Sequence, residues 1–281
     1  MLNDTSYQKI HDIATLSTVK RELIEISSDI ANYGDRIIEY IIYDPALTLT
    51  VLRTVNSAYF GFPRFIKTIP QAVSIIGSDR VLHIALSTTE LVRHQEETNI
   101  KGLTIRSLWD HSIATAIAAS EIAKKVNTNI EEEVFVCGLL HDIGKIGLIQ
   151  HNKEYIKDVV SLTRRDHSLF IEGEQELSKF DHAIIGSQIV KEWSLPEMIK
   201  YALKFHHKPF ESERFQKHVL IVNLADILAR SLVIGNPGDL SIPKLTSAVL
   251  IELELEMSAL LEIFTNILNR CNGKVNLYQD E

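Results

Sequence analysis

The chain has 281 residues, of which 45% are hydrophobic and 23% are charged, so it can bury a full core in one large or two moderate domains. Twenty-nine basic and 37 acidic residues give a formal net charge of −8. This balance offers no broad positive field for a polyanion, so nucleic acid is not an expected partner, although it leaves a local basic site open.

The cysteines and the apolar segments indicate the compartment. Cys137 and Cys271 form no C-x-x-C motif, and two cysteines are too few for a disulfide framework. The first residues lack the basic and apolar regions of a signal peptide, and no apolar run approaches the roughly 18 residues of a membrane span. We therefore expect a cytoplasmic protein that does not enter a membrane.

The first hundred residues are predicted to form a helical bundle. Apolar residues recur every three or four positions, with stop signals between the runs. The predicted helices lie at 16–30, 37–42, 45–55, 69–76 and 80–93. The start of the third is marked by Asp44, which can cap free amide groups, and by Pro45, which has no amide hydrogen to satisfy.

The second part of the chain is predicted to form a helical core, which gives an all-α fold. The predicted helices lie at 105–126, 131–140, 182–192, 196–207 and 217–231, with two polar-faced helices between 150 and 180 that are joined near 164–167. The run 134–140 is almost wholly apolar, as in a helix buried on every side. After a turn at 235–238, the pattern is mostly helical, but the alternating run 251–256 is either a break or a short strand.

Adjacent histidine and carboxylate groups follow the apolar run. An ionised Asp142 at this place would cost several kcal/mol if unpaired, so it needs a buried hydrogen bond to a histidine such as His141, or a metal ion. Gly144 allows another backbone to come close, and Lys145 supplies a mobile cation that can meet a phosphate.

Further candidate ligands lie on the predicted helices. They are His111, His182, His206, His207 and Asp226. Taken alone, His111 is an ordinary core histidine and the His206-His207 pair a solvated helix end, whereas Asp226 interrupts an apolar face and is a stronger candidate for an inward carboxylate. Imidazole and carboxylate ligands together suit Mn, Fe, Ni, Zn or Mg. We therefore expect one cavity to collect these groups around one or two divalent ions.

The order of these residues resembles the HD superfamily of metal-dependent phosphohydrolases, whose ligands are a His, an adjacent His-Asp and a distant Asp. The matching positions are His111, His141, Asp142 and Asp226. The resemblance implies an HD-type helical core over 105–235 and a metal-bound water that attacks a phosphoester. It also implies catalytic roles for Asp142 and Lys145.

More narrowly, the chain resembles the HDOD group of bacterial signalling proteins over about residues 12 to 230. The matching motifs are Asp44-Pro45-Ala46-Leu47, Asn56-Ser57-Ala58, Ile75-Ile76-Gly77, Gly138-Leu139-Leu140-His141-Asp142-Ile143-Gly144, Trp193-Ser194-Leu195-Pro196 and His206-His207. This resemblance implies a regulatory protein with a signalling protein partner. It divides the chain into an N-terminal bundle (1–104), the HD-type core (105–235) and a C-terminal helical extension (236–281).

The HDOD group in turn resembles the cyclic-di-GMP phosphodiesterases of the HD-GYP type. Their second metal site matches His182, His206 and His207, and their phosphate-facing lysine matches Lys145, so a nucleotide or cyclic dinucleotide is a candidate ligand. Two features differ. No Gly-Tyr-Pro follows the histidine pair, and Ser107 stands where some of these enzymes carry a glutamate ligand.

Three interpretations follow from the sequence. In the first, a metal or nucleotide is a structural or sensory ligand of a signalling protein. In the second, the site hydrolyses a phosphoester or a cyclic dinucleotide. In the third, buried His and Asp residues pair in a purely structural core without an ion.

Overall fold

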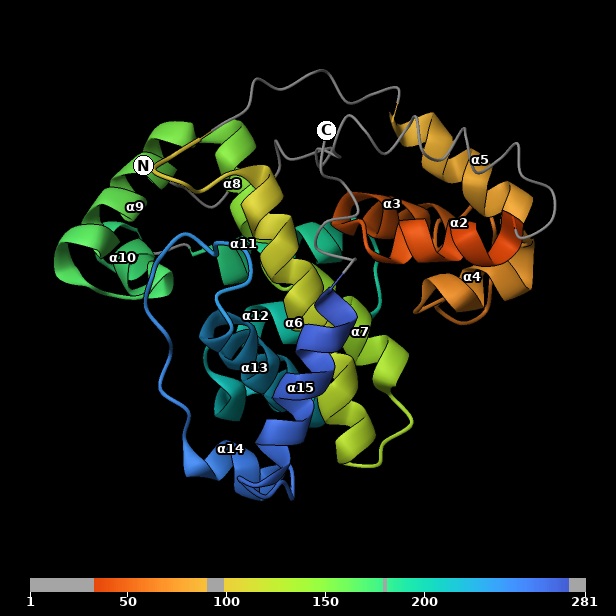
Figure 1. Cartoon of the computed structure of the whole chain (residues 1–281). Coiled ribbons are helices and arrows are strands. Elements are labelled where there is room, and N and C mark those ends of the chain that lie inside the picture. The colour runs from red at the N-terminus through yellow and green to blue at the C-terminus, as the bar shows by residue number, and fades with distance from the viewer. Residues whose placement is uncertain (1–32, 90–98, 179–180, 273–281) are drawn as a thin grey trace.

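The computed structural model describes residues 33–89, 99–178 and 181–272, which form an all-α fold (Figure 1). The helices are α2 (Tyr33–Ile42), α3 (Pro45–Val55), α4 (Ile69–Ile76), α5 (Ser78–Thr89), α6 (Ile105–Lys125), α7 (Glu131–Leu140), α8 (Ile143–His151), α9 (Lys153–Asp166), α10 (Phe170–Leu177), α11 (His182–Glu192), α12 (Glu197–Phe205), the 3-10 helix η2 (Pro209–Glu211), α13 (Gln216–Ser231), α14 (Ser247–Glu252) and α15 (Ala259–Cys271). The only β pairing in this part of the chain is an isolated bridge between Ile100 and Leu103. The predicted fold class is confirmed, while the helix expected at 16–30 lies outside the described residues.

Helices α2 to α5 gather on one side of the molecule (Figure 1). As predicted, α3 begins at Asp44, whose carboxylate accepts a hydrogen bond from the Leu47 amide at 2.8 Å, with Pro45 in the first helical position. This bundle is tied to the rest of the chain just before α4, where the ammonium group of Lys67 donates to Glu133 on α7 at 2.8 Å. One hydrophobic core runs from this bundle into the helices that follow.

Helix α6 lies at the centre of the second part and packs against α7, α13 and α15 (Figure 1). Its buried face is rich in alanine, at Ala114, Ala116, Ala118, Ala119 and Ala123. Because small side chains let helix axes approach closely, α6 brings its own His111 within reach of the helices around it.

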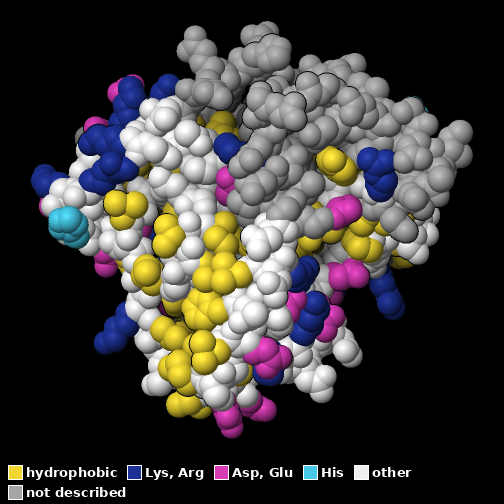
Figure 2. Space-filling view, in the orientation of Figure 1, with side chains coloured by type: hydrophobic (Ala, Val, Ile, Leu, Met, Phe, Trp, Pro, Cys, Tyr) yellow, Lys and Arg dark blue, Asp and Glu magenta, His cyan; other side chains and the backbone are white. Residues whose placement is uncertain are grey.

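The C-terminal helix α15 presents two apolar faces. Leu260 and Ile263 are buried against the core that contains α6, whereas Leu261 is 76% exposed. On α14, Ile251 is 74% exposed. Figure 2 shows hydrophobic side chains gathered over the part of the surface where these two helices lie.

Three local predictions need correction or completion. The run 251–256 is a break and not a strand, because α14 ends at Glu252 and α15 begins at Ala259. The junction expected near 164–167 lies later, because α9 continues to Asp166 and ends at His167 in a left-handed conformation. A helix that the sequence pattern did not separate, α8, begins directly after Asp142.

Two further findings concern the cysteines and the longer helices. Cys137 and Cys271 are both buried and free, as expected. Among the described residues, no helix has both the length and the apolar content needed to cross a membrane.

Candidate metal centre

The structure brings all seven predicted ligands together. His111 lies on α6 and Asp226 on α13. His141 and Asp142 stand between α7 and α8, and His182 is the first residue of α11. His206 and His207 follow the last residue of α12. Every one is buried except His207, which is half-buried. Residues up to 115 positions apart in the chain therefore share one interior cluster.

One group of possible ligands consists of His111, His141 and Asp226, whose ligand atoms all lie within 4.8 Å of one another. Nε2 of His111 is 3.0 Å from Oδ1 of Asp226, and Nε2 of His141 is 3.9 Å from the same oxygen. Two imidazoles and one carboxylate converging on a buried point form a donor set that suits a divalent transition metal.

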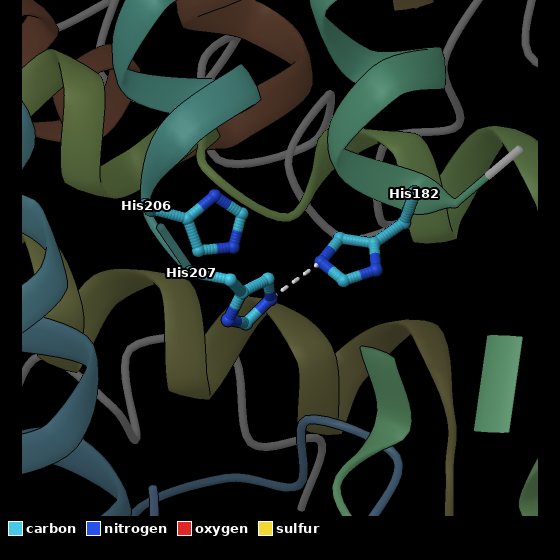
Figure 3. A group of neighbouring side chains, drawn as sticks. All are labelled: His182, His206 and His207. Carbon is cyan, nitrogen blue, oxygen red and sulfur yellow. Dashed lines mark hydrogen bonds between the residues drawn. The ribbon is translucent and has the colours of Figure 1, made fainter. Parts of the chain in front are cut away.

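A second group consists of His182, His206 and His207. Figure 3 shows His182 from α11 facing the pair that follows α12, with Nε2 of His207 3.1 Å from Nε2 of His182. The rings of His206 and His207 lie side by side, with centroids 3.9 Å apart. Three imidazoles converging in this way also suit a metal ion.

Asp142 lies between the two groups and faces both. Its Oδ1 is 3.1 Å from Nε2 of His182 and 3.9 Å from Nε2 of His206. Its Oδ2 is 3.3 Å from Nε2 of His141 and 4.0 Å from Nε2 of His111. One carboxylate oxygen therefore lies next to each group.

The outer nitrogens of the rings are held by hydrogen bonds. Nδ1 of His141 lies 2.7 Å from the Gly138 carbonyl oxygen, and Nδ1 of His206 lies 2.7 Å from that of Leu203. Because a carbonyl only accepts, these Nδ1 atoms carry the hydrogen, and in the metal-binding form of each ring the lone pair is on Nε2. Neither Nε2 has a hydrogen-bond partner among the described residues. Buried lone pairs that point at one another and at a carboxylate are stabilised when a cation lies between them, and this arrangement suits a divalent ion.

The two carboxylates are paired with buried cations. The Lys145 ammonium group donates to Oδ2 of Asp142 at 2.8 Å, and Nε of Arg230 donates to Oδ1 of Asp226 at 2.8 Å. Burial opposes ionisation, but the surrounding cations and histidines hold the pKa of both carboxyl groups well below their usual range. Both are therefore anionic and available as ligands.

The histidines differ in basicity. Burial lowers the pKa of His206 to about 3 and that of His207 well below its usual value, with neighbouring histidines adding to the effect. Burial also lowers the pKa of His111, despite its contact with Asp226. For His182, burial favours the neutral ring, but the Glu174 carboxylate raises the pKa to about 9. Most of these rings are therefore neutral, the form that binds a metal.

Lys145 is buried and fixed, whereas we expected a mobile cation. Its side chain is fully buried, and its ammonium group also donates to the Pro237 carbonyl oxygen at 3.0 Å and lies 4.8 Å from the centre of the Phe170 ring. The ammonium group is therefore fixed beside Asp142, because the segment that follows α13 encloses it.

This segment, residues 234–241, is here called the strap. A Cβ on Gly235 would lie 2.3 Å from the amide nitrogen of His111, so only glycine lets the strap pass this close to α6. The backbone amide of Asn236 donates a hydrogen bond to the Ser107 carbonyl oxygen at 2.8 Å. Both oxygens of Asp239 are 3.0 Å from Nη1 of Arg230. The strap thus lies against α6, Lys145 and the Asp226–Arg230 pair.

Ser107 has a local structural role. Its hydroxyl accepts from the Thr104 amide at 2.9 Å, and its own amide donates to the Thr104 hydroxyl at 2.9 Å. This reciprocal pair caps the start of α6.

Three buried residues at the site were not predicted: Glu174, Arg230 and Asp239. Arg230 stands four residues after Asp226 on α13, a spacing from which their ion pair could have been inferred. Glu174 and Asp239 reach the site through tertiary packing and carry no local signal in the sequence.

The structure thus defines an all-α protein with a buried His/Asp cluster assembled from five helices. The HDOD domain model matches residues 13–209, well over half of the chain, so the chain belongs to the HDOD family.

The chain is also similar to curated proteins and to solved structures. An uncharacterised protein of Treponema pallidum is 27% identical over 229 residues, which cover 80% of this chain and 43% of that protein. Ribonuclease Y of Mycoplasma genitalium is 25% identical over 153 residues, which cover 54% of this chain and 25% of that protein. The chain spans less than half the length of these curated relatives. The solved structure of the MmoQ response regulator from Methylococcus capsulatus is similar, with a TM-score of 0.70 and 21% identity over 90% of this chain and 98% of that chain. At that identity, the likeness concerns the fold alone.

Proposed function

We propose that this chain is a signalling protein that binds one or two divalent metal ions between α6, α7, α11, α12 and α13. The ligands are His111, His141, Asp142, His182, His206, His207 and Asp226. The observation that carries the proposal is the convergence of buried Nε2 lone pairs on two anionic carboxylates. The ion is Mn, Fe, Ni, Zn or Mg, the metals that accept such donors.

In this proposal, the parts of the chain have separate tasks. Residues 105–235 hold the ion, the C-terminal extension (236–281) contributes α15, which packs against α6, and residues 1–104 dock a protein partner. Large apolar side chains on the bundle support the docking role, since Tyr59 is 90% exposed and Phe65 is 50% exposed. The burial of the ligands favours a structural or sensory ion over rapid turnover. A nucleotide or cyclic dinucleotide is the alternative sensory ligand.

A second candidate function is hydrolysis of a phosphoester or a cyclic dinucleotide. It is supported by the position of Asp142, whose two oxygens face the two ligand groups. Divalent ions bound there would supply a nucleophile from water at neutral pH and stabilise developing negative charge. Asp142 would hold the ions in position, and the buried ammonium group of Lys145 would keep Asp142 ionised and neutralise charge on a phosphate.

Metal analysis of the purified chain tests the proposal. We expect one or two ions per chain after incubation with Mn²⁺ or Zn²⁺, and their loss in Asp142→Asn. Asp158→Asn, an exposed carboxylate of α9, is the matched control and should keep the metal. Absence of metal at every concentration tested would overturn both candidate functions.

Hydrolysis assays then separate the two candidates. A phosphodiester reporter and a set of cyclic dinucleotides are incubated with the metal-loaded chain, with Asp142→Asn and with Asp158→Asn. Metal without turnover supports the signalling proposal. Turnover that disappears in Asp142→Asn and persists in Asp158→Asn supports the hydrolase.

A further inference from the structure

Glu174 on α10 is a buried carboxylate that touches the candidate metal centre through one residue. Both Glu174 and His182 have a relative exposure of 0%. Oε1 of Glu174 accepts the backbone amide of His182 at 3.0 Å, and Oε2 lies 2.5 Å from Nδ1 of the same residue. Among the described residues, His182 is the only hydrogen-bond partner of this carboxylate.

The two contacts determine the direction of the His182 ring. An ionised carboxylate only accepts, so Nδ1 of His182 carries the hydrogen of that bond, and Nε2 is turned to the opposite side. There Nε2 lies 3.1 Å from Oδ1 of Asp142 and 3.1 Å from Nε2 of His207. The hydrogen bond on one edge of the ring therefore aims the other edge at the possible ligands.

His182 differs in this respect from its neighbours. His141 and His206 direct Nδ1 at backbone carbonyl oxygens, whereas His182 directs Nδ1 at a carboxylate group. A carboxylate behind an imidazole makes that ring a stronger metal donor than a carbonyl does. Burial of a carboxylate is unfavourable unless such a partner compensates it, so Glu174 at this position needs an explanation beyond packing.

We propose that Glu174 is a positioning residue of the metal centre, which holds His182 in the orientation and tautomer that bind an ion at the group formed by His182, His206 and His207. This inference rests on the proposed function. It gives α10, which supplies no ligand, the task of supporting the ligand at the start of α11. Loss of a partner of this kind typically weakens metal binding about 10- to 100-fold.

The test is a titration of the metal-free full chain with Co²⁺, followed by the visible absorption of the bound ion. Glu174→Gln keeps the size of the side chain and one acceptor oxygen but removes the charge. We expect it to weaken Co²⁺ binding at the His182 group about 10- to 100-fold and to alter the absorption spectrum. Binding at the group of His111, His141 and Asp226 should stay unchanged. Glu176→Gln, an exposed glutamate of the same helix, should match the wild type.

A double-mutant cycle separates positioning from a purely structural tie between α10 and α11. If Glu174 acts through His182, then Glu174→Gln combined with His182→Asn should bind Co²⁺ as His182→Asn alone does. Unchanged Co²⁺ affinity and spectrum in Glu174→Gln, with only a lower melting temperature of the metal-free chain, would overturn the inference and leave the metal site standing. Absence of Co²⁺ binding by the wild type would instead overturn the proposed function together with this inference. If Glu174→Gln does not fold, Glu174→Asp is tested in its place. Its shorter side chain should hold His182 less well, so we expect weaker Co²⁺ binding. Co²⁺ binding at the wild-type level in Glu174→Asp would contradict the inference.

Discussion

Gly144 and His182 are in backbone contact: a Cβ atom on Gly144 would lie 2.0 Å from the carbonyl oxygen of His182. This contact presses α8 against the first turn of α11. Because α8 begins directly after Asp142, the same contact sets the separation between Asp142 and the His182 ring, 3.1 Å between Oδ1 and Nε2. The glycine of the His-Asp motif therefore assembles the centre without being a ligand.

We predict that Gly144→Ala destabilises the chain by about 3 kcal/mol or more, because the obstructing atoms belong to backbone that cannot rotate away. Urea unfolding measures the free energy, and metal analysis should show a loss of the ion near His182. The comparison variant is Gly186→Ala in the same contact, whose nearest obstacles, a methyl group of Leu203 at 3.2 Å and the Gly144 amide nitrogen at 3.3 Å, lie farther away. Equal losses in the two variants would show that the contact is not specific to Gly144.

A second prediction concerns the buried ion pair of Lys145 and Asp142. Lys145→Met leaves the Asp142 carboxylate without its cation, and we expect the metal-free chain to lose about 3 to 5 kcal/mol of unfolding free energy. A divalent ion supplies the missing positive charge, so Mn²⁺ should stabilise this variant more than the wild type.

Melting curves with Mn²⁺ and with a chelator measure this difference. Lys157→Met is the control, because Lys157 makes an exposed pair with Glu154, which contributes at most about 1 kcal/mol. If Mn²⁺ stabilises Lys145→Met and the wild type equally, the ion does not share the charge of Asp142.

Three of the candidate ligands could be predicted from the sequence because they interrupt a helical pattern in a recognisable way. Asp226 breaks an apolar face of α13, and His141 with Asp142 ends a fully apolar helix. Helical periodicity is a local property, so it places such residues on inward faces with no knowledge of the fold. It also gave the start of α3, where Asp44 and Pro45 act within a single turn.

The residues that support the ligands could not be predicted in the same way. Glu174 reaches His182 across the junction between α10 and α11, and Asp239 reaches Arg230 across a turn. On a short polar-faced helix, a buried glutamate has the same local pattern as a solvated one. Lys145 was expected to be mobile for a related reason, since its burial depends on the strap, which joins the site through the Pro237 carbonyl oxygen.

A third prediction concerns the strap. Asp239→Asn removes the charge that faces the Arg230 guanidinium, so the strap should open more often while α13 stays folded. We expect faster hydrogen exchange over residues 234–241 and faster removal of bound metal by a chelator. Leu240→Ala changes an 81% exposed side chain of the same segment and should leave both rates unchanged. Unchanged chelation in Asp239→Asn would mean that the ion leaves by another route.

The last prediction concerns the buried cap of α3, away from the metal centre. Asp44 has a relative exposure of 0%, and its Oδ2 has no hydrogen-bond partner among the described residues. Burial raises the pKa of Asp44 from 3.8 to about 7, against the hydrogen bonds from Leu47 and Ala46. The folded chain thus keeps a proton that the unfolded chain releases at a lower pH. Stability from this group is fully present below pH 4 and is lost as the pH rises through about 7.

Asp44→Asn keeps a capping oxygen and cannot ionise. Relative to this variant, the wild type should lose on the order of 4 kcal/mol of unfolding free energy between pH 4 and pH 8, at about 1.36 kcal/mol per pKa unit. Urea unfolding of both chains at pH 4, 6 and 8 measures the difference, and Asp79→Asn on the exposed first turn of α5 controls for the loss of a charge. A difference between wild type and Asp44→Asn that does not change with pH would mean that Asp44 is ionised in the folded chain. In that case, the amide donors at the start of α3 stabilise the ionised carboxylate more than burial destabilises it, and the pKa of Asp44 is not raised.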